Sequence, residues 1–100
     1  MKRPEYPLKL VINEKQIDRV IIDQHYREKH AYLNDRTIME MVGQLNGQNF
    51  PIEETHGAFQ YFRVEPVYHD DKPHRLILLL CVADDFLGVV NAFRVARRKW

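Results

Sequence analysis

The run from Arg75 to Ala83 constrains the fold of this chain most strongly, because apart from Arg75 it is apolar throughout: Leu-Ile-Leu-Leu-Leu-Cys-Val-Ala. Successive side chains of a strand point to opposite faces of a sheet. A run without polar alternation therefore predicts a central strand that is covered on both sides. The run is also far shorter than the roughly 20 residues that a membrane-spanning helix needs, so no membrane segment is expected.

Turn and strand signals surround this central run. Residues 69–73 (His-Asp-Asp-Lys-Pro) have the composition of a turn, and Asp84-Asp85 begins a second one. Pro66 is expected to interrupt or bend the strand that precedes it. The predicted further strands cover residues 8–12, 20–22, 59–64 and 87–95.

The clearest predicted helix follows Asn34-Asp35, either of which can cap its first turn. Its apolar residues recur at helical spacing and form one stripe: Ile38, Met41, Val42 and Leu45. Asn46-Gly47 is expected to end it, and a shorter helix is predicted over residues 24–32. The expected fold is α+β, with one or two N-terminal helices packed on a three- to five-stranded antiparallel sheet in a single domain, residues 1–100.

Cysteine usage and the N-terminus indicate a cytoplasmic protein. Cys81 is the only cysteine, so no intramolecular disulfide is possible, and a free thiol within an apolar run is typical of a reducing compartment. The basic start of the chain is followed by Pro7 and Lys9 instead of a long apolar stretch, which is not the pattern of a signal peptide.

The net charge of +1 gives no general argument for a nucleic-acid partner. The charge is uneven, however, because the C-terminal end is basic and lacks acids: Arg94, Arg97, Arg98 and Lys99. This segment can meet a phosphate backbone, or it can be a solvated tail, and the sequence leaves both possibilities open.

Metal and nucleophilic chemistry are disfavoured by spacing. His25 and His30 are five residues apart, which on a helix separates them by about 140°. Zinc-binding helical pairs instead occupy one face at i, i+4. Cys81 lies among apolar residues, where a thiol is inert, and no glycine-rich phosphate loop is present. No metal or cofactor is therefore expected.

Acid–base cleavage of RNA needs neither a metal ion nor a cofactor. The 2′-hydroxyl of RNA can attack the adjacent phosphate if a protein supplies a base, an acid and cations for the developing charge. The segment from His25 to His30 (His-Tyr-Arg-Glu-Lys-His) contains all three kinds of group, with His25 and Lys29 at i, i+4. Polar residues also occur in the otherwise apolar strands: Arg63, Arg75, Asn91 and Arg94.

This arrangement resembles the barnase–EndoU–colicin–RelE superfamily of metal-independent ribonucleases. The resemblance covers about residues 8–96 and rests on the His25–His30 segment, the helix after Asn34, and the strands at 75–80 and 89–94. It implies an endoribonuclease toxin that cleaves tRNA or mRNA in the cytoplasm, including that of a target cell if the toxin is delivered. It also implies a neutralising antitoxin or immunity protein.

The resemblance further implies roles for individual residues. His25 would be the general acid or base, Lys29 and Arg94 phosphate clamps, and Asn91 a positioning group. The remaining candidates for RNA contact are His30, Arg63, Arg75, Arg97 and Arg98. Asn91 and Arg94 have a spacing that places them on opposite faces of a regular strand, so a bulge would be needed to bring them into one cleft.

An alternative hypothesis is a non-catalytic interaction domain, such as an immunity or adaptor protein. It is supported by the near-zero net charge and by tyrosines expected at the surface, because tyrosine is enriched at protein interfaces. These are Tyr26, Tyr32, Tyr61 and Tyr68.

Overall fold

A computed structural model describes residues 3–95 of the chain. The described elements follow one another as β1 (Glu5–Ile12), β2 (Lys15–Ile22), the 3-10 helix η1 (Gln24–Glu28), α1 (Asp35–Gly43), β3 (Glu54–His56), β4 (Phe59–His69), β5 (Lys72–Cys81) and β6 (Phe86–Arg94). No helix within residues 3–95 is long and apolar enough to cross a bilayer.

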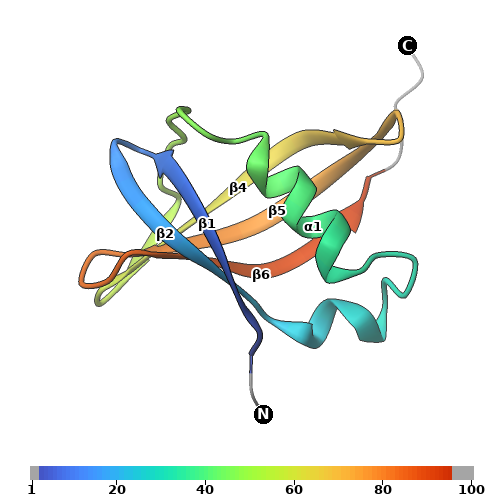
Figure 1. Ribbon diagram of the computed structural model, residues 1–100, viewed down its shortest axis with the longest axis horizontal. Helices are drawn as coiled ribbons and strands as arrows, with labels where there is room; N and C mark the ends of the chain where they lie inside the picture. The colour runs from blue at the N-terminus through green and yellow to red at the C-terminus, as the bar shows by residue number, and fades with distance from the viewer. Residues whose placement is uncertain (1–2, 96–100) are drawn as a thin grey trace.

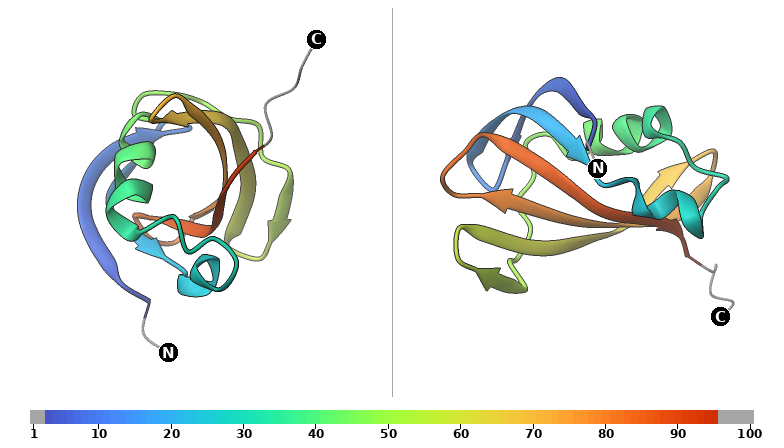
Figure 2. Two further views of the ribbon diagram at one scale, coloured as in Figure 1. Left: turned by 90° about the vertical axis from the view of Figure 1, so that its right-hand side faces the viewer. Right: turned by 90° about the horizontal axis from the view of Figure 1, so that it is seen from below.

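The strands form one six-stranded sheet in the order β1-β2-β6-β5-β4-β3. Neighbouring strands are antiparallel except for β2 and β6, which pair in parallel. The sheet curls into a half-barrel, and α1 lies across its open side, as Figures 1 and 2 show. We call the face toward α1 the inner face and the opposite, convex face the outer face.

The expected fold class is therefore wrong. One α-helix packs on a curled sheet of six strands, in place of one or two helices on a sheet of three to five antiparallel strands. The difference arises at the N-terminus, where β1 and β2 form a long hairpin. Its turn, Asn13-Glu14, has positive φ at both residues, a backbone form that matches the twist of two-residue hairpins. The parallel pairing of β2 with β6 then adds this hairpin to the sheet.

The predicted helix is confirmed as α1, but it ends at Gly43 with Gln44 as its C-cap, before the expected end at Asn46-Gly47. Its apolar side chains fill the half-barrel. Ile38, Met41 and Val42 have no exposed surface and pack with side chains from the inner face of the sheet. Asn34 is the N-cap, since its Oδ1 accepts a hydrogen bond from the Thr37 amide at 2.8 Å. The shorter helix predicted over residues 24–32 is only one 3-10 segment, Gln24–Glu28, which Asp23 caps.

The apolar run lies in β5, an interior strand of the sheet as predicted, but only one of its faces is covered. Leu76, Leu78 and Leu80 point inward and are buried. Ile77 and Leu79 alternate with them on the outer face and are half-buried. The expectation of cover on both sides is wrong because the half-barrel closes around its inner face alone. The outer face is left partly apolar and open.

Candidate functional site

Polar side chains from three strands meet on the outer face in two neighbouring rows. The first row consists of Asn91 on β6, Ile77 on β5 and Arg63 on β4, which are paired in register. The second row begins with Phe93 opposite Arg75. Side chains on one face of a strand recur every two residues, or about 7 Å, and neighbouring strands are about 4.8 Å apart. The two rows therefore form one compact patch.

Glu65 completes the second row through a forked ion pair. Arg75 donates from Nε to Oε1 of Glu65 at 2.7 Å and from an Nη nitrogen to Oε2 at 3.1 Å. The hydrogen bond that Arg75 donates to Glu65 is the main cause that raises the pKa of Arg75, so the guanidinium stays charged. Both side chains keep about a third of their surface exposed to solvent. This pair orients a carboxylate and a cation side by side at the surface.

Arg63 in the first row has a carboxylate partner as well. Its Nε lies 3.0 Å from a carboxylate oxygen of Glu53, and both side chains are about half exposed. The backbone amide of Glu53 donates to the carbonyl of Tyr61 at 2.9 Å, which holds this residue beside β4. An exposed ion pair of this kind contributes little to stability, and a guanidinium has the geometry to bind two phosphate oxygens.

His30 reaches the patch because the chain after β2 continues alongside β6. The pairing of β2 with β6 ends at Ile22–Val89, and η1 then lies against the remaining part of β6. The His30 ring stacks on Phe93 with centroids 5.4 Å apart and an interplanar angle of 26°. The Arg75 guanidinium carbon is 5.5 Å from the centroid of the same Phe93 ring. Within residues 3–95, nothing hydrogen-bonds the imidazole nitrogens of His30.

Asn91 is placed on the outer face by a bulge. The register of β5 and β6 shifts between Ile77 and Leu78, so that Val89 points into the core while Asn91 points outward. The Oδ1 atom of Asn91 accepts a hydrogen bond from the Ala92 amide at 2.9 Å, which leaves the side-chain NH₂ group as the donor. We call the five polar residues of this patch the outer cluster: His30, Arg63, Glu65, Arg75 and Asn91.

The other predicted residues do not join the outer cluster. His25 has 62% of its side chain exposed and lies 3.2 Å from Glu28, and Lys29 is exposed. Arg94 is paired in register with the buried His74, on the face opposite to Phe93. Its amide donates to the Tyr32 hydroxyl at 2.7 Å, and its guanidinium lies over the Tyr32 ring.

The separation of Asn91 and Arg94 agrees with their spacing, since the bulge precedes both residues. Arg97 and Arg98 lie outside the described residues, so the structure places neither. Sequence reasoning missed Glu65 and Phe93. A signal for Glu65 was available, because it follows Arg63 by two residues and therefore shares its face in a strand.

A buried carboxylate holds η1 and the His30 segment against the rest of the fold. Asp35, the first residue of α1, accepts hydrogen bonds from the hydroxyls of Tyr6 at 2.6 Å and Tyr26 at 2.5 Å, and from the Gln24 amide. Burial favours a higher pKa of Asp35, but the bonds from Tyr26, Tyr6 and Gln24 together outweigh it and lower the pKa. Burial, followed by the bond to Asp35, raises the pKa of Tyr26. The expectation of an exposed Tyr26 is wrong.

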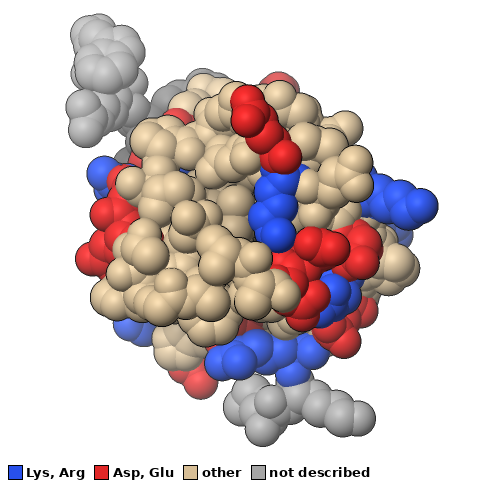
Figure 3. All heavy atoms as spheres, turned by 90° about the vertical axis from the view of Figure 1, so that its left-hand side faces the viewer, with Lys and Arg blue, Asp and Glu red and all other residues tan. Residues whose placement is uncertain are grey.

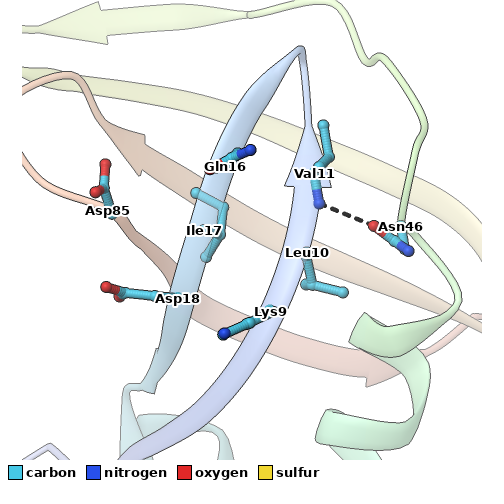
Figure 4. A pocket seen from close by; sticks show the side chains of 8 residues that line it. All are labelled: Lys9, Leu10, Val11, Gln16, Ile17, Asp18, Asn46 and Asp85. Atoms are coloured by element: carbon cyan, nitrogen blue, oxygen red, sulfur yellow. Dashed lines mark hydrogen bonds between the residues drawn. The ribbon is translucent and has the colours of Figure 1, made fainter.

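The hollows lined by residues 3–95 include a pair that lies outside the outer cluster. One, of about 430 Å³, lies over the β1–β2 hairpin and is lined by Lys9, Asp18, Asn46 and Asp85 among others (Figure 4). In it, Oδ1 of Asn46 accepts a hydrogen bond from the Val11 amide at 2.8 Å. The second, of about 320 Å³, lies on the outer face beside the cluster. Neither is lined by His25, Lys29 or Arg94.

The described residues contain no group of three or more His, Cys, Asp or Glu side chains arranged to hold a metal ion. Figure 3 shows the end of the molecule formed by the strand turns. Charged side chains of both signs lie along one part of this end and around its rim, beside a broad uncharged area. Near the strand turns, Lys15 pairs with Asp85 and Arg19 with Asp84.

Comparison with known proteins finds no match to a protein family, to a curated protein or to a solved structure.

Proposed function

We propose that the chain is a metal-independent endoribonuclease and that the outer cluster is its active site. The observation that carries the proposal is the row formed by Glu65, Arg75, Phe93 and His30. It places a carboxylate and an imidazole at its two ends, with a guanidinium between them. Arg63 and Asn91 flank it in the neighbouring row. These are the groups that transesterification of RNA needs.

The reaction follows from this arrangement. Glu65 takes the proton of the 2′-hydroxyl, whose oxygen attacks the adjacent phosphorus while the bond from phosphorus to the 5′-oxygen breaks. His30, which enters the step as the imidazolium, gives its proton to the departing 5′-oxygen. Arg75 and Arg63 stabilise the charge on the phosphoryl oxygens, and Asn91 donates a hydrogen bond. The products are a 2′,3′-cyclic phosphate and a free 5′-hydroxyl.

This assignment shifts the general acid or base from His25 to His30 and adds Glu65 as its counterpart. The chemistry is the one that the resemblance in sequence implied, and we take tRNA or mRNA as the substrate. In that setting the protein acts in the cytoplasm, where its RNA substrates are. A nuclease of this kind is paired with an antitoxin or immunity protein that covers its active site.

The test is digestion of total RNA by the purified protein in the presence of EDTA, with analysis of the new ends. We expect cleavage that leaves 2′,3′-cyclic phosphates. Glu65→Gln keeps the shape of the side chain but removes the base, and should slow cleavage by about 10²- to 10⁴-fold. Glu40→Gln, on α1 at the other side of the sheet, is the matched control and should cleave at the wild-type rate. Intact RNA with the wild-type protein, or equal rates for Glu65→Gln and wild type, would contradict the proposal.

The interaction-domain hypothesis keeps one specific observation in its favour. Tyr32 and Tyr68 have 54% and 53% of their surface exposed, and exposed tyrosines are common at protein interfaces. The two functions differ in a simple way. A ribonuclease should arrest growth when it is expressed alone, and Glu65→Gln should relieve that arrest, whereas an interaction domain should be harmless in both forms.

A further inference from the structure

An aromatic groove lies beside the outer cluster on the outer face. It runs across the strands from Ile21 on β2, over Gly88 on β6 and Leu79 on β5, to Phe59 and Tyr61 on β4. Phe86 lines it on β6, and Arg3 and Asp23 form an ion pair of 3.1 Å near its β2 end. Its volume of about 320 Å³ is at the lower end of the range of small-ligand sites, roughly 300–1,000 Å³.

The groove exists because position 88 lacks a side chain. A Cβ atom there would lie 2.8 Å from Cγ of Leu79 and 2.9 Å from one of its methyl carbons, closer than carbon atoms normally approach. Leu79 therefore lies flat against the β6 backbone and forms an apolar floor. Phe59 and Phe86 lie outside the hydrophobic core and line the groove above this floor.

The groove and the outer cluster are continuous. Tyr61 precedes Arg63 by two residues on the same face of β4, and Leu79 follows Ile77 by two on β5. Val90, which lines the groove, directly precedes Asn91. The groove is thus one row, or about 7 Å, from the first row of the cluster. A polymer whose phosphate lies on the cluster places its next unit over the groove.

We propose that this groove binds an unpaired nucleobase of single-stranded RNA, the one next to the phosphate held by the outer cluster. An apolar floor with aromatic walls suits the flat face of a base, and proteins that read single-stranded RNA stack its bases on such side chains. The exposed Phe59, 39% of whose surface meets solvent, would be covered by this contact. The inference rests on the proposed function and specifies its substrate as RNA with unstacked bases.

Binding of a non-cleavable probe separates this inference from catalysis. The probe is a short, fluorescently labelled 2′-O-methyl RNA of mixed sequence, and its affinity is measured by anisotropy. Stacking on one aromatic contributes enough that Phe59→Ala and Phe86→Ala should each weaken binding by about 5- to 100-fold. Tyr68→Ala, which removes an exposed tyrosine elsewhere on β4, is the matched control and should bind as the wild type. Thermal melting of each variant checks that it is folded.

A second probe with the same backbone but with abasic positions tests what the groove recognises. It should bind the wild type and both phenylalanine variants with equal, low affinity. The inference is overturned if Phe59→Ala and Phe86→Ala bind the base-containing probe as the wild type does, or if they weaken the abasic probe equally. Cleavage in EDTA that persists in that case would leave the ribonuclease proposal intact. Groove-dependent binding without any cleavage would reject the ribonuclease and keep the groove as an RNA site.

Discussion

At the scale of single residues, Asp35 connects the core to the proposed site. Its carboxylate joins β1, η1 and α1 through Tyr6, Tyr26 and Gln24, and Arg27 lies 3.6 Å away. The segment that follows η1 carries His30, so the position of the imidazole depends on this buried contact. Sequence reasoning found Asp35 only as a possible cap, because a buried partner from another element leaves no local pattern in the chain.

Replacing Asp35 by Asn should destabilise the protein by about 1–3 kcal/mol at neutral pH, since hydrogen bonds to a charged group are lost or weakened. The folded-state pKa of Asp35 is below its unfolded value of about 3.9. The unfolded chain therefore takes up the proton first as the pH falls, and the stabilisation by Asp35 is lost as pH falls through the folded pKa.

Urea unfolding at several pH values measures how much the Asp35 carboxylate stabilises the protein. The difference between wild type and Asp35→Asn should be full above about pH 4 and should shrink at lower pH. Asp18→Asn, at an exposed position paired with Arg19, is the control and should change stability by less than about 0.5 kcal/mol at neutral pH. A difference that grows on acidification would contradict the assignment.

At the scale of elements, the periodicity of apolar residues predicted the segments that face the core, α1 and β5. It missed β3 at one edge of the sheet and underestimated β1 at the other. The apolar stripe of α1 and the apolar run of β5 each contain enough apolar residues to be recognised from the sequence. β3 could not be predicted, because its residues Glu54 to His56 are all exposed. The lengths of β1 and β2 were underestimated, because their connection by Asn13-Glu14 does not contain the glycine that usually marks such a turn.

The Asn13-Glu14 turn provides a test of the β1–β2 hairpin. Glu14 has φ of 64°, a left-handed backbone conformation that costs a residue with a side chain roughly 1 kcal/mol relative to glycine. Glu14→Gly should therefore stabilise the protein by about 0.5–1 kcal/mol in urea unfolding, since Asn-Gly suits this hairpin best. Glu14→Ala, which keeps a Cβ atom, should give no such gain. A loss of stability in Glu14→Gly would show that the hairpin does not have this turn.

At the scale of the whole molecule, the sheet curls around one core and leaves its outer face, with the proposed site, partly open to solvent. The sequence contained the residues of the site: His30, Arg63, Arg75 and Asn91 were all among the predicted candidates. The sequence alone did not show that these residues lie together. Their proximity depends on the register across β4, β5 and β6 and on the bulge before Asn91. His25 was favoured over His30 from local spacing alone, whereas stacking on Phe93 is a long-range contact.

Since the net charge is only +1, the proposed RNA binding would have to depend on local cations. Each phosphate contact made by a cation to single-stranded RNA adds about −0.7 to the slope of log affinity against log salt. Arg63→Ala should make this slope shallower by about that amount. Arg36→Ala, which removes an exposed arginine on α1, is the matched control and should leave the slope unchanged. Equal slopes for Arg63→Ala and wild type would remove Arg63 from the RNA contact.

Participation of the His30 imidazole in RNA cleavage has a direct test, because the chain also carries His25, an exposed histidine outside the outer cluster. The measurement is the rate of RNA cleavage in EDTA by His30→Ala and His25→Ala. We expect a loss of about 10²- to 10⁴-fold for His30→Ala and a near wild-type rate for His25→Ala. The reverse order, with His25→Ala inactive and His30→Ala active, would contradict it.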